Sequence, residues 1–236
     1  ASDVYKRQPF THQDNMKANV SLIALAVTVA ASAMVSCTCH HFEEPETSMK
    51  IGHVLCTDGG VMPICKFLES DKEAIGIVFY VNTDPNKDFQ GYAVYLHDFT
   101  PAAFSDSVPA SQGTSCDFYA EDGNENTYSL YINENVSSPM ASEVFDLWKY
   151  GQSAYVPSVQ QQRLLLAAKS RINDRIVVCG GDSIPDVDDE CWYWTSTEVE
   201  GQAEAKAWLY SLYSGTVQET PKTQIHKVRP IVTIKK

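Results

Sequence analysis

Basic residues are scarce in this chain of 236 residues. It has 18 Lys and Arg against 30 Asp and Glu, which gives a formal net charge of −12, and no run of basic residues occurs. Binding to a nucleic-acid backbone requires clustered Lys and Arg. The composition therefore argues against a nucleic-acid partner.

The sequence also lacks the short motifs that mark common enzyme classes. Gly-x-Ser-x-Gly, His-Glu-x-x-His and a Walker-type phosphate loop are all missing. His97 and Asp98 are adjacent, but no nucleophile can be placed beside them to complete a triad. We therefore predict a binding protein and not an enzyme.

Hydrophobic residues are plentiful, and one apolar run lies near the start. Residues 16–36 combine Lys17, an apolar stretch from Leu22 to Val35 and the small residue Ser36 ahead of Cys37. This order is typical of a secretory signal peptide, and Ser36-Cys37 resembles the lipobox of bacterial lipoproteins. The resemblance implies a lipid anchor on Cys37.

A transmembrane helix is the alternative interpretation of the same run. Residues 18–36 carry no charge and approach the roughly 20 residues that span a bilayer. However, Glu43, Glu44 and Glu46 follow, whereas a cytoplasmic flank is rich in Lys and Arg. We therefore favour a lipoprotein signal.

The chain divides into four parts. Residues 1–15 resemble translated sequencing-adapter read-through and are expected to be non-native. Residues 16–36 are the signal peptide, 37–49 an anchor and acidic tether, and 50–236 a single domain. The acidic tether resembles a surface-export signal of Gram-negative lipoproteins, so we expect a surface-exposed outer-membrane lipoprotein in the cell envelope.

The domain reads as strands interrupted by helices. Strands are expected at 51–55, 74–81, 92–96, 175–179, 192–196, 207–213 and 227–234, with a hairpin at Gly215. Two helices are expected, one from Ser138-Pro139 to Gly151 and one that begins at Ser158 with a Gln161 capping box. Residues 101–135 read as irregular. This pattern predicts an α+β fold with a largely antiparallel sheet, two helices and long loops.

Four short motifs follow one another in the second half of the domain: Tyr155-Val156-Pro157-Ser158, Tyr193-Trp194-Thr195-Ser196-Thr197, Ala207-Trp208 and Val228-Arg229-Pro230-Ile231. Their order resembles the collagen-like adhesin C-terminal domain family of bacterial surface lipoproteins, over residues 50–236. The resemblance implies a C-type lectin-like fold, similar also to the formylglycine-generating enzyme core, with paired first and last strands and termini that lie together.

The motifs that carry activity in those folds are missing. Glu-Pro-Asn, Gln-Pro-Asp, Trp-Asn-Asp and Gly-Gly-Ser-Trp do not occur. Neither calcium-dependent sugar binding nor cysteine oxidation can therefore be transferred to named residues of this chain.

The acidic loop ahead of Trp192 is the best candidate site. Asp186, Asp188, Asp189 and Glu190 precede that tryptophan, and we predict ligand binding by these five residues. Asp182, Asp186 and Asp188 are candidate calcium ligands, since calcium prefers oxygen donors. The alternative is a hydrated loop, which we also expect for Asp117, Glu121, Asp122 and Glu125. No cofactor is expected apart from calcium.

Six cysteines remain after Cys37. An exported compartment permits disulfides, and two pairs are close in sequence: Cys56 with Cys65, and Cys179 with Cys191. Free buried thiols are the alternative for each pair.

These observations predict a lipid-anchored surface lipoprotein that binds an extracellular glycan, mucin or protein as an adhesin. The alternatives are a structural or tip subunit of a surface assembly such as a fimbria, and an enzyme on the formylglycine-type scaffold with a reactive cysteine.

Overall fold

The structure is a computed structural model that describes residues 48–145, 148–149 and 152–236. The predicted signal peptide, the lipidation site Cys37 and most of the tether lie outside the described residues. Residues 47–236 form one compact unit. No helix in the described part of the chain has the length and apolar character needed to cross a membrane.

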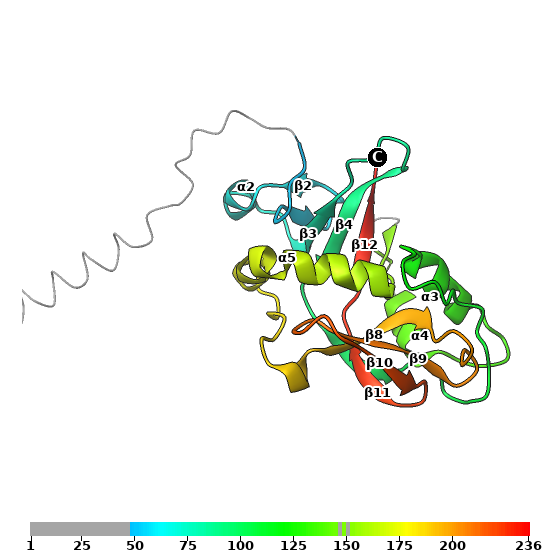
Figure 1. Ribbon diagram of the computed structural model, residues 1–236. Coiled ribbons are helices and arrows are strands. Elements are labelled where there is room, and N and C mark those ends of the chain that lie inside the picture. Colours follow the sequence, from blue (N-terminus) through cyan, green and yellow to red (C-terminus); the bar gives the residue numbers. More distant parts are fainter. Residues whose placement is uncertain (1–47, 146–147, 150–151) are drawn as a thin grey trace, which may run out of the picture. The chain divides into compact units, whose positions relative to one another are not determined.

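Two five-stranded sheets form the framework (Figure 1). The first sheet contains, in spatial order, β12 (Ile231–Lys235), β4 (Phe89–Tyr95), β3 (Ala74–Val81), β1 (Val54–Cys56) and β2 (Val61–Met62). The second contains β10 (Val217–Pro221), β9 (Lys206–Ser211), β8 (Trp192–Glu198), β11 (Ile225–Val228) and β5 (Phe99–Ala103). A short hairpin pairs β6 (Trp148–Lys149) with β7 (Gln152–Ser153).

The strand pairing is antiparallel in both sheets except between β8 and β11, where Lys227 faces Tyr193 in a parallel pair. Together with helices between the strands, this confirms the predicted α+β class. The C-type lectin-like fold stays a prediction.

The helices are α2 (Ile64–Leu68), α3 (Gly123–Tyr131), α4 (Pro139–Phe145) and α5 (Val159–Val178), with a short 3-10 turn η1 (Asp188–Glu190). The predicted capping box of α5 is confirmed, because the Ser158 side chain accepts from the Gln161 N–H and the Gln161 side chain accepts from the Ser158 N–H. Each bond satisfies an amide that has no partner within the helix.

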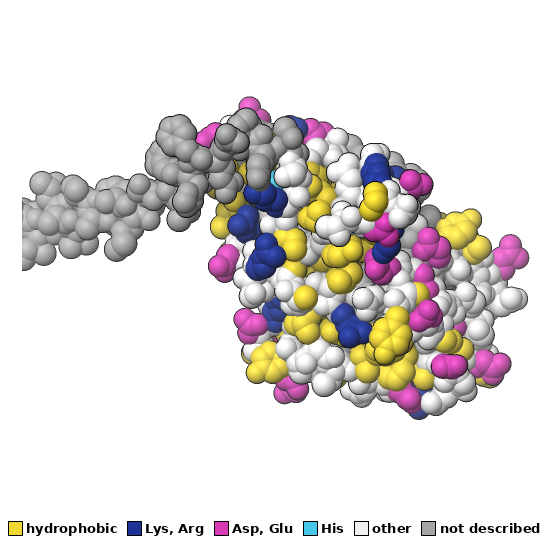
Figure 2. Space-filling model, turned by 45° about the horizontal axis from the view of Figure 1, so that its top comes forward, with side chains coloured by type: hydrophobic (Ala, Val, Ile, Leu, Met, Phe, Trp, Pro, Cys, Tyr) yellow, Lys and Arg dark blue, Asp and Glu magenta, His cyan; other side chains and the backbone are white. Residues whose placement is uncertain are grey.

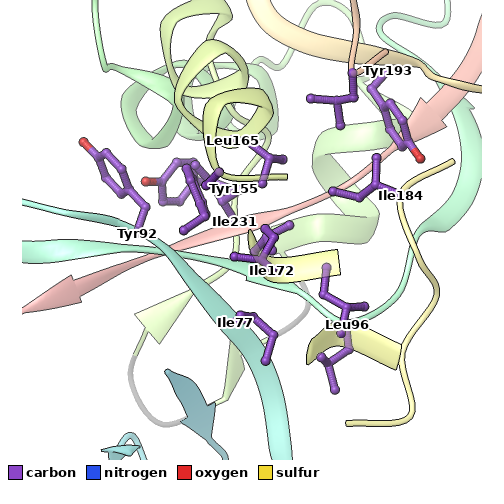
Figure 3. Packing of buried hydrophobic residues seen from close by; sticks show 14 of the residues in the cluster. Ile77, Tyr92, Leu96, Tyr155, Leu165, Ile172, Ile184, Tyr193 and Ile231 are labelled. Carbon is purple, nitrogen blue, oxygen red and sulfur yellow. The ribbon is translucent and has the colours of Figure 1, made fainter. Parts of the chain in front are cut away.

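The core lies on both faces of both sheets and against α5. One cluster joins α5 to both sheets and includes Ile77, Tyr155, Leu165, Ile172 and Tyr193, as Figure 3 shows. A second cluster lies on the other face of β8, where Trp194 packs edge-on against Phe104. Tyr193 and Trp194 therefore point to opposite faces of β8, as strand geometry predicts.

Several predicted elements are corrected. Residues 175–179 are not a strand, because α5 continues through Val178 with Cys179 as its C-cap. The region read as irregular contains α3, and a second unexpected helix, α2, follows β2. The expected first helix ends at Phe145 and not near Gly151.

The predicted last strand is two strands in different sheets. Arg229 and Pro230 separate β11 from β12, since proline lacks the N–H that a continuous ladder needs. The expectation that the first and last strands pair is also wrong: β12 pairs with β4, and β1 with β2 and β3. The two ends of the domain nevertheless lie close together, because Ser48, Met49 and Lys236 line one surface hollow of about 270 Å³.

Candidate functional site

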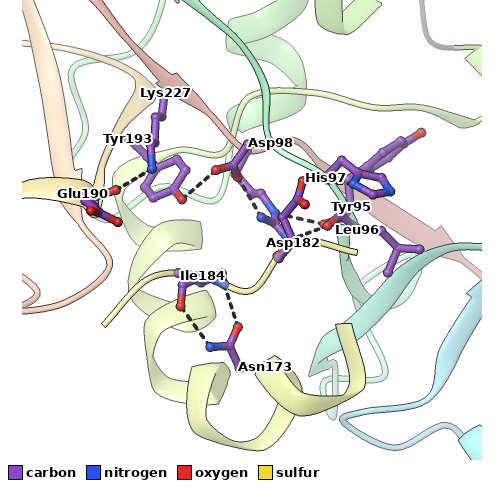
Figure 4. Close-up of polar contacts among 11 residues, drawn as sticks. Tyr95, Leu96, His97, Asp98, Asn173, Asp182, Ile184, Glu190, Tyr193 and Lys227 are labelled. Atoms are coloured by element: carbon purple, nitrogen blue, oxygen red, sulfur yellow. Dashed lines mark hydrogen bonds and ion pairs between the residues drawn. The ribbon is translucent and has the colours of Figure 1, made fainter. Parts of the chain in front are cut away.

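The acidic loop between α5 and β8 is held firmly by the helix beside it. The Asn173 side chain donates to the Ile184 carbonyl (2.9 Å) and accepts from the Ile184 N–H (2.7 Å), as drawn in Figure 4. Lys169, buried on the same helix, donates to the carbonyls of Pro185 and Leu212. The loop therefore has a fixed path ahead of Trp192.

A buried arginine joins this loop to both sheets. The Arg229 guanidinium donates to the carbonyls of Tyr95, Leu96 and Asp182, each within 3.0 Å. Its Nη1 also donates to Asp98 Oδ1 at 2.8 Å. Arg229 is fully buried, and its guanidinium acts as a structural hydrogen-bond donor.

Tyr193 completes the same network. Its hydroxyl donates to Asp98 Oδ2 at 3.0 Å (Figure 4). Burial raises the pKa of Tyr193, and the charge of Asp98 raises it further. The phenol is thus held neutral and serves as a hydrogen-bond donor to the carboxylate that pairs with Arg229.

A groove of about 310 Å³ opens beside this network. It is lined by Pro101, Asp189, Glu190, Trp192, Leu209, Gln218, Ile225, His226 and Lys227. Leu209 is buried, Trp192 is half-buried and Ile225 is exposed, so the groove has an apolar floor and one apolar wall. Three of its residues, Asp189, Glu190 and Trp192, belong to the predicted ligand-binding set.

The polar groups around the groove are mixed in character. Asp189 and Glu190 are exposed carboxylates, whereas the Lys227 ammonium donates to the Glu190 carbonyl at 2.8 Å and lies over the Tyr193 ring. His226 packs edge-on against Trp194, and burial lowers its pKa. An apolar floor with donors and acceptors at its edge can bind a small group that is apolar on one face and polar at its margin.

Asp186 and Asp188 are placed outside the groove. Asp186 pairs with Lys169 at 2.7 Å, and Asp188 accepts from the Ser211 hydroxyl at 3.3 Å. Asp182 lies 3.0 Å from a His97 ring nitrogen on another loop. The structure does not bring the three candidate calcium ligands together, and the described residues contain no group of three or more His, Cys, Asp or Glu that could hold a metal ion.

The second acidic stretch is less hydrated than predicted. Glu121 accepts from the Tyr92 hydroxyl at 2.9 Å and pairs with Lys87 at 3.2 Å. Burial raises the pKa of Asp122, and its carboxylate accepts from Asn126. These two residues attach the loop ahead of α3 to its surroundings. Asp117 and Glu125 are exposed, as expected for a hydrated loop.

All five described cysteines are free thiols, so neither sequence-local disulfide is present. Cys191 is buried and donates to the Pro185 carbonyl. Burial raises the pKa of both Cys179 and Cys191. A raised pKa keeps a thiol protonated at neutral pH.

The residues that shape the groove opposite the acidic loop were not predicted from the sequence. Pro101, Gln218 and Ile225 come from β5, β10 and β11, and only the strand order brings them beside Trp192. Nothing local in the sequence marks them, because each is an ordinary exposed position of an edge or near-edge strand.

Comparison with known proteins gives a structural similarity. No family model matches the chain, and the search of curated proteins finds no match. Among solved structures, the chain is similar to a fimbrial protein from Bacteroides ovatus ATCC 8483, with a TM-score of 0.60 and 17% sequence identity. The match covers 78% of this chain and 49% of that one, so the chain spans about half the length of the fimbrial protein. At this identity the similarity shows a shared fold.

Proposed function

We propose that this protein is a cell-surface protein and a subunit of a fimbria-like assembly. The observation that carries the proposal is the fold shared with a fimbrial protein over most of this chain. The lipobox-like Ser36-Cys37 supports it, because a lipid anchor would hold the subunit at the outer membrane. The sequence offered this function as an alternative to the adhesin, and the shared fold favours it.

Assembly can be tested on whole cells. Amine-reactive cross-linking of cells that produce the full chain is expected to give species larger than the monomer, and surface proteolysis of intact cells is expected to digest the domain. Recovery of monomer alone, with the domain protected from protease, would contradict both the assembly and the surface location.

A second function, ligand binding as an adhesin, is favoured by the groove beside Trp192. A half-buried tryptophan flanked by exposed carboxylates on a fixed loop is typical of a recognition surface. We propose that an extracellular glycan, mucin or protein binds there. The family resemblance to collagen-like adhesin domains agrees with this function.

The groove can be tested with a matched pair of variants. Trp192→Ala removes the exposed side of the groove floor, whereas Tyr213→Ala removes an aromatic side chain that is 52% exposed and does not line the groove. On a glycan and mucin array, we expect Trp192→Ala to weaken binding at least tenfold, or about 1.4 kcal/mol, and Tyr213→Ala to bind normally. Equal binding by both variants would exclude the groove.

Calcium dependence is measured in the same assay, with added Ca²⁺ and again with chelator. The scattered positions of Asp182, Asp186 and Asp188 predict binding that does not change with chelator. Loss of binding in chelator would instead place a metal near the acidic loop.

A further inference from the structure

Two cysteines that are far apart in sequence share one region of the core. Cys56 ends β1 and is fully buried in the cluster that α5 forms with the first sheet. Cys179 caps α5 and packs against the same cluster. Neither Cys65 nor Cys191, their nearest neighbours in sequence, belongs to that cluster.

The face of α5 explains why Cys179 points toward β1. The buried positions Leu165, Ala168, Ile172 and Ile176 recur every three or four residues, and Cys179 is the next position on this stripe. The stripe faces the first sheet, since α5 packs on β3 and β3 pairs with β1 through Cys56 and Ala74.

A direct contact links the end of α5 to the segment just before β1. Arg175, one turn before Cys179, donates from Nη1 to the Gly52 carbonyl at 3.0 Å. Its side chain passes so close to Gly52 that an added Cβ would lie 2.8 Å from it, and Gly52 has a φ of +90°. The segment leading into β1 and the last turn of α5 are therefore held side by side.

Cys56 also acts electrostatically on Cys179. Burial raises the pKa of Cys179, and Cys56 raises it further. Cys191, by contrast, is committed to the Pro185 carbonyl, and Cys65 is partly exposed on α2.

We propose that Cys56 and Cys179 form a disulfide when the protein reaches an oxidising compartment. Two S–H bonds break and one S–S bond forms. The two electrons and two protons pass to a disulfide oxidant, either a protein that carries a reactive disulfide or glutathione disulfide, which becomes two thiols. The bond ties β1 to the end of α5 and replaces both sequence-local pairs. It depends on an oxidant, and the proposed assembly or ligand binding is not required for it.

The test is peptide mapping of the full chain after oxidation by glutathione disulfide. Remaining thiols are alkylated in denaturant, and the protein is digested without reduction. We expect one cross-linked peptide that joins Cys56 to Cys179, with Cys65, Cys116 and Cys191 alkylated. A Cys56–Cys65 or Cys179–Cys191 peptide, or alkylation of both Cys56 and Cys179, would overturn the proposal.

Two variants separate the pairing from effects on folding. Cys65→Ser combined with Cys191→Ser removes both sequence-local partners, and the cross-link is expected to remain. Cys179→Ala leaves the buried Cys56 in place, and oxidation is expected to give no cross-link to Cys56. Because the bond closes a long loop, oxidation should raise the Tm of the native chain by roughly 5–15 °C, and the Cys179→Ala chain should show no such rise.

Discussion

At the scale of single residues, Arg229 makes four hydrogen bonds from a fully buried position. It lies between β11 and β12, and its guanidinium reaches three carbonyls and the Asp98 carboxylate. A fully buried cation is tolerated only when it is paired and hydrogen-bonded. The Arg-Pro motif thus has a structural explanation that needs no bound ligand.

Replacement of Arg229 by methionine is expected to destabilise the domain by about 3–5 kcal/mol, because it leaves Asp98 and three carbonyls without their donor. Urea denaturation measures this loss. Arg163→Met is the control, since Arg163 is exposed on α5 and such a change costs under about 0.5 kcal/mol. Similar midpoints for the two variants would contradict the structural role of Arg229.

His226 gives the domain a pH-dependent contribution to stability. Burial against Trp194 lowers its pKa below the ordinary 6.5, so the folded state binds the proton less tightly than the unfolded state does. The stability that the neutral form of His226 contributes is therefore fully present above about pH 6.5, and it is lost as the pH falls below that value. We expect His226→Gln to lose less stability than the native chain between about pH 7.5 and 5.5. Parallel stability curves for the two proteins would contradict this assignment.

At the scale of elements, a buried ion pair attaches the long segment before α3 to the second sheet. Glu198 on β8 and Lys222, just after β10, form a pair with side chains that are 1% and 0% exposed. Lys222 also donates to the Ala110 carbonyl at 3.0 Å, and the Gln112 N–H donates to Glu198 at 3.1 Å. Burial lowers the pKa of Lys222. The charge pair thus adds side-chain contacts to the backbone hydrogen bonds that Ser105 and Ala110 of this segment make.

Lys222→Met is expected to lower the free energy of unfolding by about 3–5 kcal/mol, because it leaves the Glu198 carboxylate buried without a cation. Combination with Glu198→Gln removes that charge and keeps an acceptor for Gln112, so the double variant should be more stable than the single one. Thermal unfolding measures both. A double variant less stable than Lys222→Met would show that the pair is not the source of the loss.

Element by element, the sequence predicted those parts in which local signals agree with tertiary packing. Strand β3 begins and ends where the β-branched run does, and α5 begins at its capping box. The run Ile176-Val177-Val178 favours a strand by propensity, but α5 extends through it because its buried stripe continues at Ile176. Helix α3 was missed because its sequence is largely polar and shows no clear apolar period.

At the scale of the whole molecule, the lipid anchor remains the prediction that decides where the domain works. Cys37→Ser is expected to move the protein from the membrane fraction to the soluble fraction and to abolish labelling by a fatty-acid analogue, since the acyl chains are attached through that sulfur. Cys39→Ser should leave both unchanged and serves as the control. Membrane retention of the Cys37→Ser chain would support the transmembrane alternative.

The arrangement of the strands could not be predicted from sequence. The groove needs β5, β8, β10 and β11 in one sheet, and those strands are separated by up to about half of the chain. The acidic loop and Trp192 were identifiable because they are adjacent in sequence, whereas the opposite wall depends on strand order. Acidic side chains are also spread over the face drawn in Figure 2, so net charge alone does not point to a site.

The placement of β11 and β12 bears on the order in which the chain acquires its structure during folding. β11 lies between β8 and β5 inside the second sheet, and β12 completes the edge of the first. Both sheets are therefore complete only after residues 225–235 have paired with strands that come much earlier in the sequence. Pairings at this sequence separation form slowly, so we expect β11 and β12 to join their sheets late in folding.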